Sequence, residues 1–165
     1  MGATKPEEYG GYYAWGETEE KSYYDWSTYI HCDGTEDTCH DLGSDISGTD
    51  YDVAHVKWSG KWCMPTVDDI KELLDNCTIE WTTLNGVNGR KFTSRINGNS
   101  IFLPAAGYRW YGDLYYAGVD GYYWSSSQYP DHSYGANGIY FYSGYIDWYA
   151  FYRNLGKSVR PVIRN

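Results

Sequence analysis

Residues 62–77 read WCMPTVDDIKELLDNC, and this stretch predicts one helix at a defined place in the chain. Pro65 and Thr66 begin the helix, with Thr66 as N-cap and Asp69 as its acidic capping-box partner three residues later. The apolar residues that follow are spaced i, i+3, i+4 and i+7, and they are Ile70, Leu73, Leu74 and Cys77. This spacing places them on one face, so we expect that face to pack against a core.

Outside this stretch the sequence indicates one more short helix and a set of short strands. The shorter helix runs from Asp52 through Ala54 to Trp58. Asn-Gly pairs at 85, 88, 97 and 137 are typical of tight turns and hairpins. The β-rich segments are Ser100–Leu103, Gly121–Ser126, Gly138–Tyr142 and Ser158–Ile163. We therefore predict a single α+β domain over residues 1–165, with one or two helices, small antiparallel sheets and long loops.

Composition and charge exclude several classes of protein. The 165 residues (19.0 kDa) include 19 % aromatics, too many for a disordered chain, and no apolar run approaches the roughly 18 residues of a membrane span. The net charge is −9; eighteen acidic and five basic side chains leave residues 1–80 at −13, whereas residues 81–105 carry +3 and 106–165 carry +1. Without a basic cluster, neither nucleic acid nor a membrane surface is an expected partner.

Signatures of an enzyme are scarce. The sequence has no Gly-rich phosphate loop, no HExxH, no GxSxG and no CxxC. Its carboxylates are concentrated in the acidic first half, without the apolar surroundings that would raise the pKa of a catalytic carboxyl group. His132 lies among turn residues and is expected to be solvated, whereas His55 is expected to pack or to cap a helix. We therefore expect no catalytic residue and no cofactor.

The N-terminus, MGATKPEEYGG, lacks the basic and apolar regions of a signal peptide. A Tyr/Trp segment (Tyr12, Tyr13 and Trp15) follows almost at once. We expect the chain to be the C-terminal fragment of a longer protein whose export signal or anchor lies upstream. Its expected location is then extracellular, at a cell surface or on a phage particle.

The four cysteines lie in the first half of the chain, at Cys32, Cys39, Cys63 and Cys77. An even count in a small loop-rich domain is compatible with two disulfides, Cys32 with Cys39 and Cys63 with Cys77. His31-Cys32 and Cys39-His40 also offer zinc-type ligands, although at no common zinc spacing, and the carboxylates between them offer a calcium loop. A disulfide or a plain surface hairpin is the favoured interpretation.

Residues 107–157 hold thirteen of the twenty tyrosines. In GIYFY (138–142) the alternation predicts that Ile139 and Phe141 face a core while Tyr140 and Tyr142 face outward. Exposed tyrosines separated by Ser, Gly, Asn and Asp are typical of binding loops, because each ring gives a large amphipathic contact at a low entropy cost. A Tyr-rich core is the alternative, but each buried hydroxyl would need a partner.

Residues 129–156 contain no Lys, Glu, Gln or Met and only one Trp, Trp148. Every amino acid at the candidate outward positions has a codon that an Asn codon yields when only its two adenines change. We call these positions the display set; they are Tyr129, Asp131, His132, Tyr134, Gly135, Gly138, Tyr140, Tyr142, Tyr145, Asp147, Tyr149, Ala150, Phe151, Tyr152, Asn154 and Leu155.

Four segments carry a resemblance to a known family. Trp62–Ile70 (WCMPTVDDI) is similar to the W-R-L-P-T-x-x-E-W segment of the Fibrobacter succinogenes major paralogous domain family and of formylglycine-generating-enzyme-like proteins. Leu103–Arg109, Gly121–Ser126 and Gly156–Val162 resemble that family's later motifs, in the same order. The resemblance spans roughly residues 9–165 and implies a C-type lectin-like fold.

Within that fold, residues 107–157 resemble the variable region of diversity-generating retroelement target proteins, where adenine-directed reverse transcription rewrites Asn codons at surface positions. The resemblance implies that the display set is the varied, ligand-binding face. The implied fixed framework is Trp124, Ser125, Ser126, Ile139, Phe141, Trp148, Arg153, Gly156 and Ser158–Val162. Earlier positions that extend the face are Trp110, Tyr111, Asp113, Tyr115, Tyr116 and Asp120, although Trp110 has no route from an Asn codon.

The chain also departs from its relatives. Cys63 stands where the family usually has Arg, and the EPN, QPD and WND sugar-binding motifs of calcium-dependent lectins are missing. The C-terminal cysteines needed for formylglycine generation are missing too. We therefore expect a monomeric, non-catalytic module that binds an unidentified protein or glycan. The alternative is a surface domain with one fixed partner, and a less favoured one is an enzyme related to formylglycine-generating enzyme.

Overall fold

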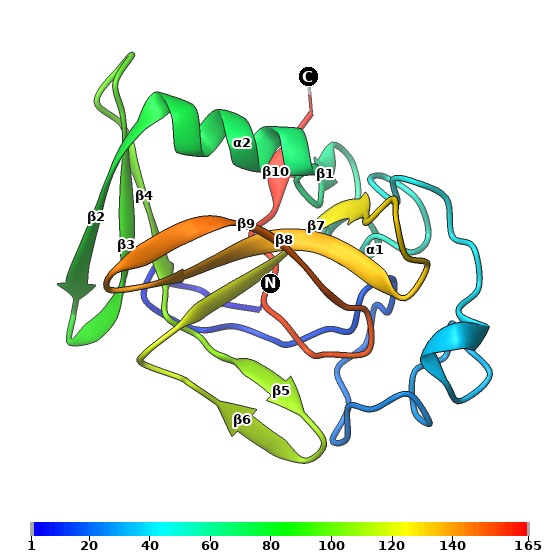
Figure 1. The fold of residues 1–165 in the computed structure, drawn as a ribbon. Helices are drawn as coiled ribbons and strands as arrows, with labels where there is room; N and C mark the ends of the chain where they lie inside the picture. The colour runs from blue at the N-terminus through cyan, green and yellow to red at the C-terminus, as the bar shows by residue number, and fades with distance from the viewer. Residues whose placement is uncertain (1, 165) are drawn as a thin grey trace.

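The computed structural model describes residues 2–164 (Figure 1). Within this range the helices are α1 (Val53–Trp58) and α2 (Val67–Asn76), with a short 3-10 turn, η1 (Glu36–Thr38). The strands are β1 (Trp62–Cys63), β2 (Cys77–Leu84), β3 (Val87–Ser94), β4 (Ser100–Pro104), β5 (Tyr108–Trp110), β6 (Asp113–Tyr115), β7 (Gly121–Gln128), β8 (Gly135–Tyr142), β9 (Tyr145–Tyr152) and β10 (Val162–Ile163). They pair as β1-β10, β2-β3-β4, β5-β6 and β7-β8-β9, all antiparallel. The predicted α+β class with small antiparallel sheets is confirmed.

Both predicted helices form, and polar side chains cap them. Thr66 Oγ1 accepts the Asp69 N–H at 3.2 Å while Asp69 Oδ2 accepts the Thr66 N–H at 2.7 Å, so the predicted capping box of α2 is confirmed. The buried carboxylate of Asp52 caps α1 by accepting the Ala54 N–H at 2.8 Å, and its other oxygen accepts the Met64 N–H at 2.8 Å. No helix in residues 2–164 combines the length and the apolar content needed to cross a membrane.

The sheet β7-β8-β9 lies beneath α2, so one of its faces is covered and the other is open to the β5-β6 side (Figure 1). On β8, Ile139 and Phe141 are buried in the same cluster as Ile70 of α2. Tyr140 is half-buried and Tyr142 is exposed on the opposite face. The predicted alternation of residues 138–142 is therefore confirmed.

The strand prediction is incomplete at several places, and it contains no counterpart of β1, β5 or β6. The sequence does not predict β9, because apolar and aromatic residues occupy both of its faces and hide the period of two. The turn between β2 and β3 forms at Asn85 and Gly86 with φ of 49° and 81°, as Asn-Gly predicts, but the flanking strands are too polar to be recognised. The strand expected at Ser158–Ile163 shortens to β10, since Ser158 makes only an isolated bridge with Tyr123.

The irregular N-terminal segment is part of the core. Tyr13 and Lys157 exchange backbone hydrogen bonds of 2.9 and 3.0 Å. The indole N–H of Trp15 donates to the Ser125 carbonyl at 2.9 Å, and that of Trp124 donates to the Tyr13 carbonyl at 2.8 Å. Both indoles are fully buried, and each places its polar edge on a backbone acceptor. These bonds hold the first part of the chain against the last.

The guanidinium of Arg153 is buried where the N-terminal segment meets the end of β9. Its Nε donates to the Tyr29 hydroxyl at 2.8 Å, and its Nη1 donates to the carbonyls of Ser133 at 2.7 Å and His40 at 3.0 Å. The guanidinium carbon lies 4.7 Å from the ring centre of Trp15. One side chain therefore links four separate segments of the chain.

We predict that Arg153→Met destabilises the fold, because methionine fills much of the volume but leaves the Tyr29 hydroxyl and two carbonyls without their donor. The free energy of unfolding is expected to fall by about 3 kcal/mol or more. The control is Arg160→Met at an exposed position, where a change below about 0.5 kcal/mol is expected. Urea denaturation measures both, and equal midpoints for the two variants would contradict the role of Arg153.

Candidate functional site

The predicted binding residues lie on three neighbouring surfaces: the β5-β6 hairpin, the open face of β7-β8-β9, and a groove along the end of β9. Ring contacts connect them. Tyr108 lies 5.7 Å from Tyr115 on the hairpin and 4.9 Å from Tyr122 on the sheet, measured between ring centres. Tyr149 and Phe151 of β9 lie 5.4 Å apart and join the sheet to the groove. The aromatic side chains thus form one continuous surface.

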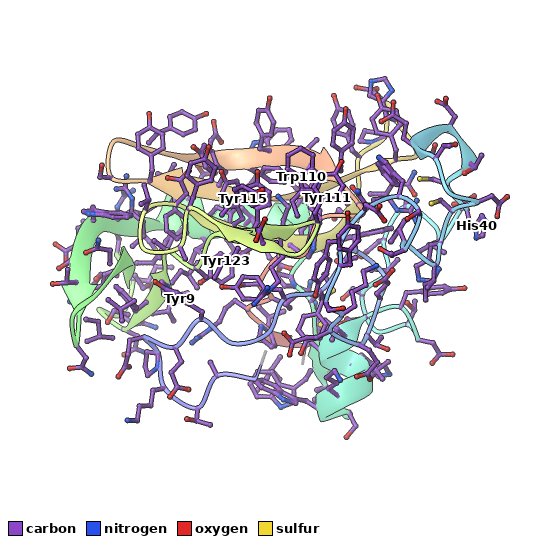
Figure 2. The ribbon with its side chains drawn as sticks, turned by 90° about the horizontal axis from the view of Figure 1, so that it is seen from below. Tyr9, His40, Trp110, Tyr111, Tyr115 and Tyr123 are labelled. Carbon is purple, nitrogen blue, oxygen red and sulfur yellow. The ribbon has the colours of Figure 1, made fainter. Side chains whose placement is uncertain are left out.

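The hairpin carries an aromatic platform (Figure 2). Trp110 and Tyr111 stack with 4.8 Å between ring centres, and Tyr115 lies 6.1 Å from Trp110. The backbone of Tyr111 exchanges hydrogen bonds of 2.8 and 2.9 Å with Tyr24, a buried residue, which fixes the platform to the core. The exposed members are Trp110, Tyr111, Asp113 and Tyr116, whereas Tyr115 is half-buried.

On the open sheet face, hydroxyl groups are held by a carboxylate. Tyr122 and Tyr140 both donate to Asp120 Oδ2, at 3.2 and 3.3 Å. Burial, and next the Asp120 carboxylate, raise the pKa of both tyrosines. Their hydroxyls therefore stay protonated at neutral pH. Tyr142 and Tyr145 extend this face to the turn between β8 and β9, where their rings stack with 6.0 Å between ring centres.

Lys157, whose amine is enclosed by aromatic rings, lies beneath this face. Its side chain is fully buried, and among residues 2–164 its Nζ has no hydrogen-bond partner. The Nζ lies 3.3 Å from the ring centre of Phe151, 4.6 Å from that of Tyr122 and 5.0 Å from that of Trp124. Burial holds the pKa of Lys157 well below its usual range. The rings of the open face are therefore packed from below around a fixed amine.

A groove with a volume of about 540 Å³ opens beside the end of β9. Its lining residues are Tyr129, His132, Tyr134, Gly135, Trp148, Tyr149, Ala150, Phe151, Tyr152 and Leu155. Nine of these ten belong to the display set, and Trp148 is the exception. Nine of the sixteen display-set positions therefore meet on one concave surface.

The rings around the groove support one another. His132 and Tyr134 stack with 4.9 Å between ring centres and 7° between planes. Tyr134 lies 5.6 Å from Tyr152, whose ring meets Trp26 edge-on at 5.8 Å. His132 is exposed in the loop between β7 and β8, as predicted for a solvated loop histidine. The groove is thus formed by the loop before β8 and by β9, with Trp26 of the N-terminal half behind it.

Several positions differ from their expected roles. Asp120 is only 8 % exposed, because Tyr122 and Tyr140 cover it and donate to its carboxylate. Gly135 is buried at the start of β8.

Gly138 is not free to vary, because a Cβ there would lie 2.4 Å from the Tyr123 carbonyl oxygen of β7. Asn154 is only 3 % exposed, because the chain turns inward after β9. Trp148, expected in the framework, is 39 % exposed because β9 is an edge strand. Alternation along one strand cannot show which neighbouring strands or loops cover its residues.

The remaining predicted positions keep surface access to different degrees. Asp131 is exposed, and Asp147 and Phe151 are half-buried. Tyr108 and Tyr122 are not among the predicted binding residues, although both contribute half-buried rings to the aromatic surface. The alternation Gly121-Tyr122-Tyr123-Trp124 is the signal that places Tyr122 on the face opposite to buried Tyr123.

All four cysteines are free thiols in this structure. Cys32 and Cys39 form an antiparallel bridge at the base of a surface hairpin. His31 Nε2 lies 2.9 Å from the Gly16 carbonyl and His40 Nε2 lies 3.0 Å from Asp33 Oδ1, so the two imidazoles are bound to separate partners. Across residues 2–164, no three His, Cys, Asp or Glu side chains are grouped so that they could hold a metal ion.

We predict that Cys32 and Cys39 form a disulfide when oxidised. The His40 N–H donates to the His31 carbonyl at 2.8 Å, so the cysteines are a non-hydrogen-bonded pair, with Cα atoms about 4.5 Å apart in such ladders. That separation lies in the range of about 4.4–6.8 Å found for disulfides. Burial raises the pKa of Cys39 to about 11, which leaves little thiolate and predicts slow oxidation at neutral pH.

Treatment with oxidised glutathione followed by peptide mass mapping measures this pairing. The expected product is one internal disulfide between Cys32 and Cys39, with Cys63 and Cys77 still open to alkylation after unfolding. Cys63 belongs to the β1-β10 pair and Cys77 to the cluster with Phe92, which keeps them in separate parts of the fold. A Cys63–Cys77 product in the folded protein would contradict the structure.

Comparison with known proteins finds one family whose sequence pattern matches the part of the chain that forms this surface. The family described as "Domain of unknown function (DUF8237)" matches residues 77–162, which is more than half of the chain, and the chain belongs to it. The matched region contains the hairpin, the sheet β7-β8-β9 and the groove. No curated protein and no solved structure matches the chain.

Proposed function

We propose that this member of the DUF8237 family is a non-catalytic binding module with a C-type lectin-like fold, which presents a diversified tyrosine-rich surface to a ligand outside the cell or on a phage particle. The ligand would be a protein or a glycan. The single observation that carries this proposal is the agreement between the display set and the groove lining, nine of whose ten residues belong to that set.

The arrangement of the groove suits a binding surface better than a structural core. Tyr149 and Tyr152 are 59 % and 48 % exposed, so each ring offers contact area to a ligand. Each phenol adds a hydroxyl that can donate or accept, and few rotamers are lost on binding. Beneath the groove, Arg153 is fully buried and fixed by hydrogen bonds. In the proposed module the varied tyrosine rings would therefore be supported from beneath by a residue that does not vary, Arg153.

The fold part of the proposal is supported by where the four resemblance segments lie. Trp62–Ile70 supplies β1 and the start of α2, and Gly121–Ser126 supplies most of β7. Gly156–Val162 returns the chain so that β10 pairs with β1. Leu103–Arg109 ends β4 and begins β5. Sequence motifs that are far apart in the chain thus supply elements around one core, and the display set lies between the last two of them.

The coding DNA of related isolates tests the proposal. We expect substitutions confined to the first two bases of display-set codons other than that of Gly138, next to a near-copy repeat that carries adenines there. The codons of Gly138, Ile139 and Phe141 serve as internal controls, and they should not change, because close packing fixes these residues. Substitutions spread evenly over all codon positions, or an invariant segment without a repeat, would overturn diversification and leave a domain with one fixed partner.

A further inference from the structure

Resting on the proposed function, we infer that the groove beside β9 binds a positively charged side chain, an arginine or lysine presented by a partner protein. Among the ligands that a tyrosine surface accommodates, this assignment selects a basic protein segment over neutral and acidic glycans. The inference follows from the ring faces that line the groove, from the carboxylates around it and from the absence of lysine and arginine from its lining.

The rings supply the first half of the site. A cation over the face of Tyr or Trp is attracted by the ring quadrupole within about 6 Å. Tyr134 and Tyr152, with ring centres 5.6 Å apart, and exposed Tyr149 all line the groove. Phe151 also lines it, but Lys157 Nζ already lies 3.3 Å from the Phe151 ring centre. His132 stacks on one face of Tyr134, with 4.9 Å between ring centres. The other face of Tyr134 and the rings of Tyr149 and Tyr152 are therefore the ones available to an incoming cation.

Carboxylates supply the second half. Arg153 Nη1 donates to both Ser133 and His40 carbonyls, at 2.7 and 3.0 Å, so the loop that precedes β8 lies next to the loop that contains η1. The η1 loop carries Glu36 and Asp37. Burial, then Tyr152, then these two carboxylates raise the pKa of Tyr134, which is the direction that negative charge nearby produces.

The loop before β8 adds one more carboxylate. Asp131 is exposed, and its carboxylate raises the pKa of Tyr129. Tyr129 is itself part of the groove lining. Negative charge therefore flanks the tyrosines from two separate loops.

Basic side chains are nearly absent from this surface. No lysine or arginine lines the groove, and residues 129–156 contain only Arg153, which is fully buried. Lys71 of α2 is not part of the lining, although its Nζ lies 5.1 Å from the ring centre of Trp148, which is part of it. A field of this sign attracts cations and repels phosphate or sialic acid.

The experiment is an NMR titration of the purified chain with N-acetyl-arginine methylamide. The matched neutral probe is N-acetyl-citrulline methylamide, which has nearly the same shape without the charge, and galactose and sialic acid represent neutral and acidic glycans. We expect shifts at Tyr134, Tyr149 and Tyr152, with the arginine probe binding at least about fivefold tighter than the citrulline probe. Added salt should reduce this preference, because the carboxylates lie at the surface.

Variants separate the two halves of the site. Asp131→Asn and Asp37→Asn should each weaken the arginine probe by about two- to fivefold, whereas the control Asp50→Asn, at an exposed position outside the groove, should leave it unchanged. Tyr149→Leu removes an exposed ring and should weaken the arginine probe without lowering the melting temperature. Equal binding of the two amide probes, preference for either sugar, or no binding of any probe would each overturn the inference.

The outcomes also separate this inference from the proposed function. If the chain binds galactose at the same tyrosines and its display-set codons vary, the proposed binding module stands and the inference of a cationic ligand is wrong. A chain with invariant codons loses diversification whichever probe it binds.

Discussion

The buried guanidinium of Arg153 is the interaction on which the rest of the structure depends. Residues 2–52 have no regular secondary structure besides η1, so their backbone groups need partners from elsewhere in the chain. Arg153 provides three donors at once, to Tyr29, His40 and Ser133, from a position directly after β9. It thereby fixes the loop that forms one wall of the groove and the N-terminal segment behind it.

A few residues after Arg153, Lys157 plays a related part for the sheet. Its amine is enclosed by the rings of Phe151, Tyr122 and Trp124, which come from two strands. These two basic side chains are buried beneath the tyrosines, while carboxylates flank the groove and no lysine or arginine lines it. The separation explains how one surface could change its side chains while its support remains constant. It also explains why that surface would favour a basic partner.

The helices and the inward-outward alternation of β8 are predicted well from sequence, because both are determined by residues close together in the chain. Thr66 and Asp69 set the start of α2, and Ile139 and Phe141 set the inward face of β8. Tertiary neighbours decide the rest. Gly138 has the codon chemistry of a varied position, yet the carbonyl of Tyr123 leaves no room for a Cβ. Neither Arg153 nor Lys157 can be recognised as buried from sequence, since both residue types are usually exposed.

The most direct test of a variable surface on a fixed support is saturation mutagenesis of residues 129–157, with protease resistance of the displayed protein as the measure of folding. We expect Tyr134, Tyr149 and Tyr152 to accept most amino acids, whereas Gly138, Phe141 and Arg153 should accept almost none. The positions that tolerate substitution should gather around the groove. If the groove tyrosines were as intolerant as Phe141, they would be part of the core, and the separation of display from support would be contradicted.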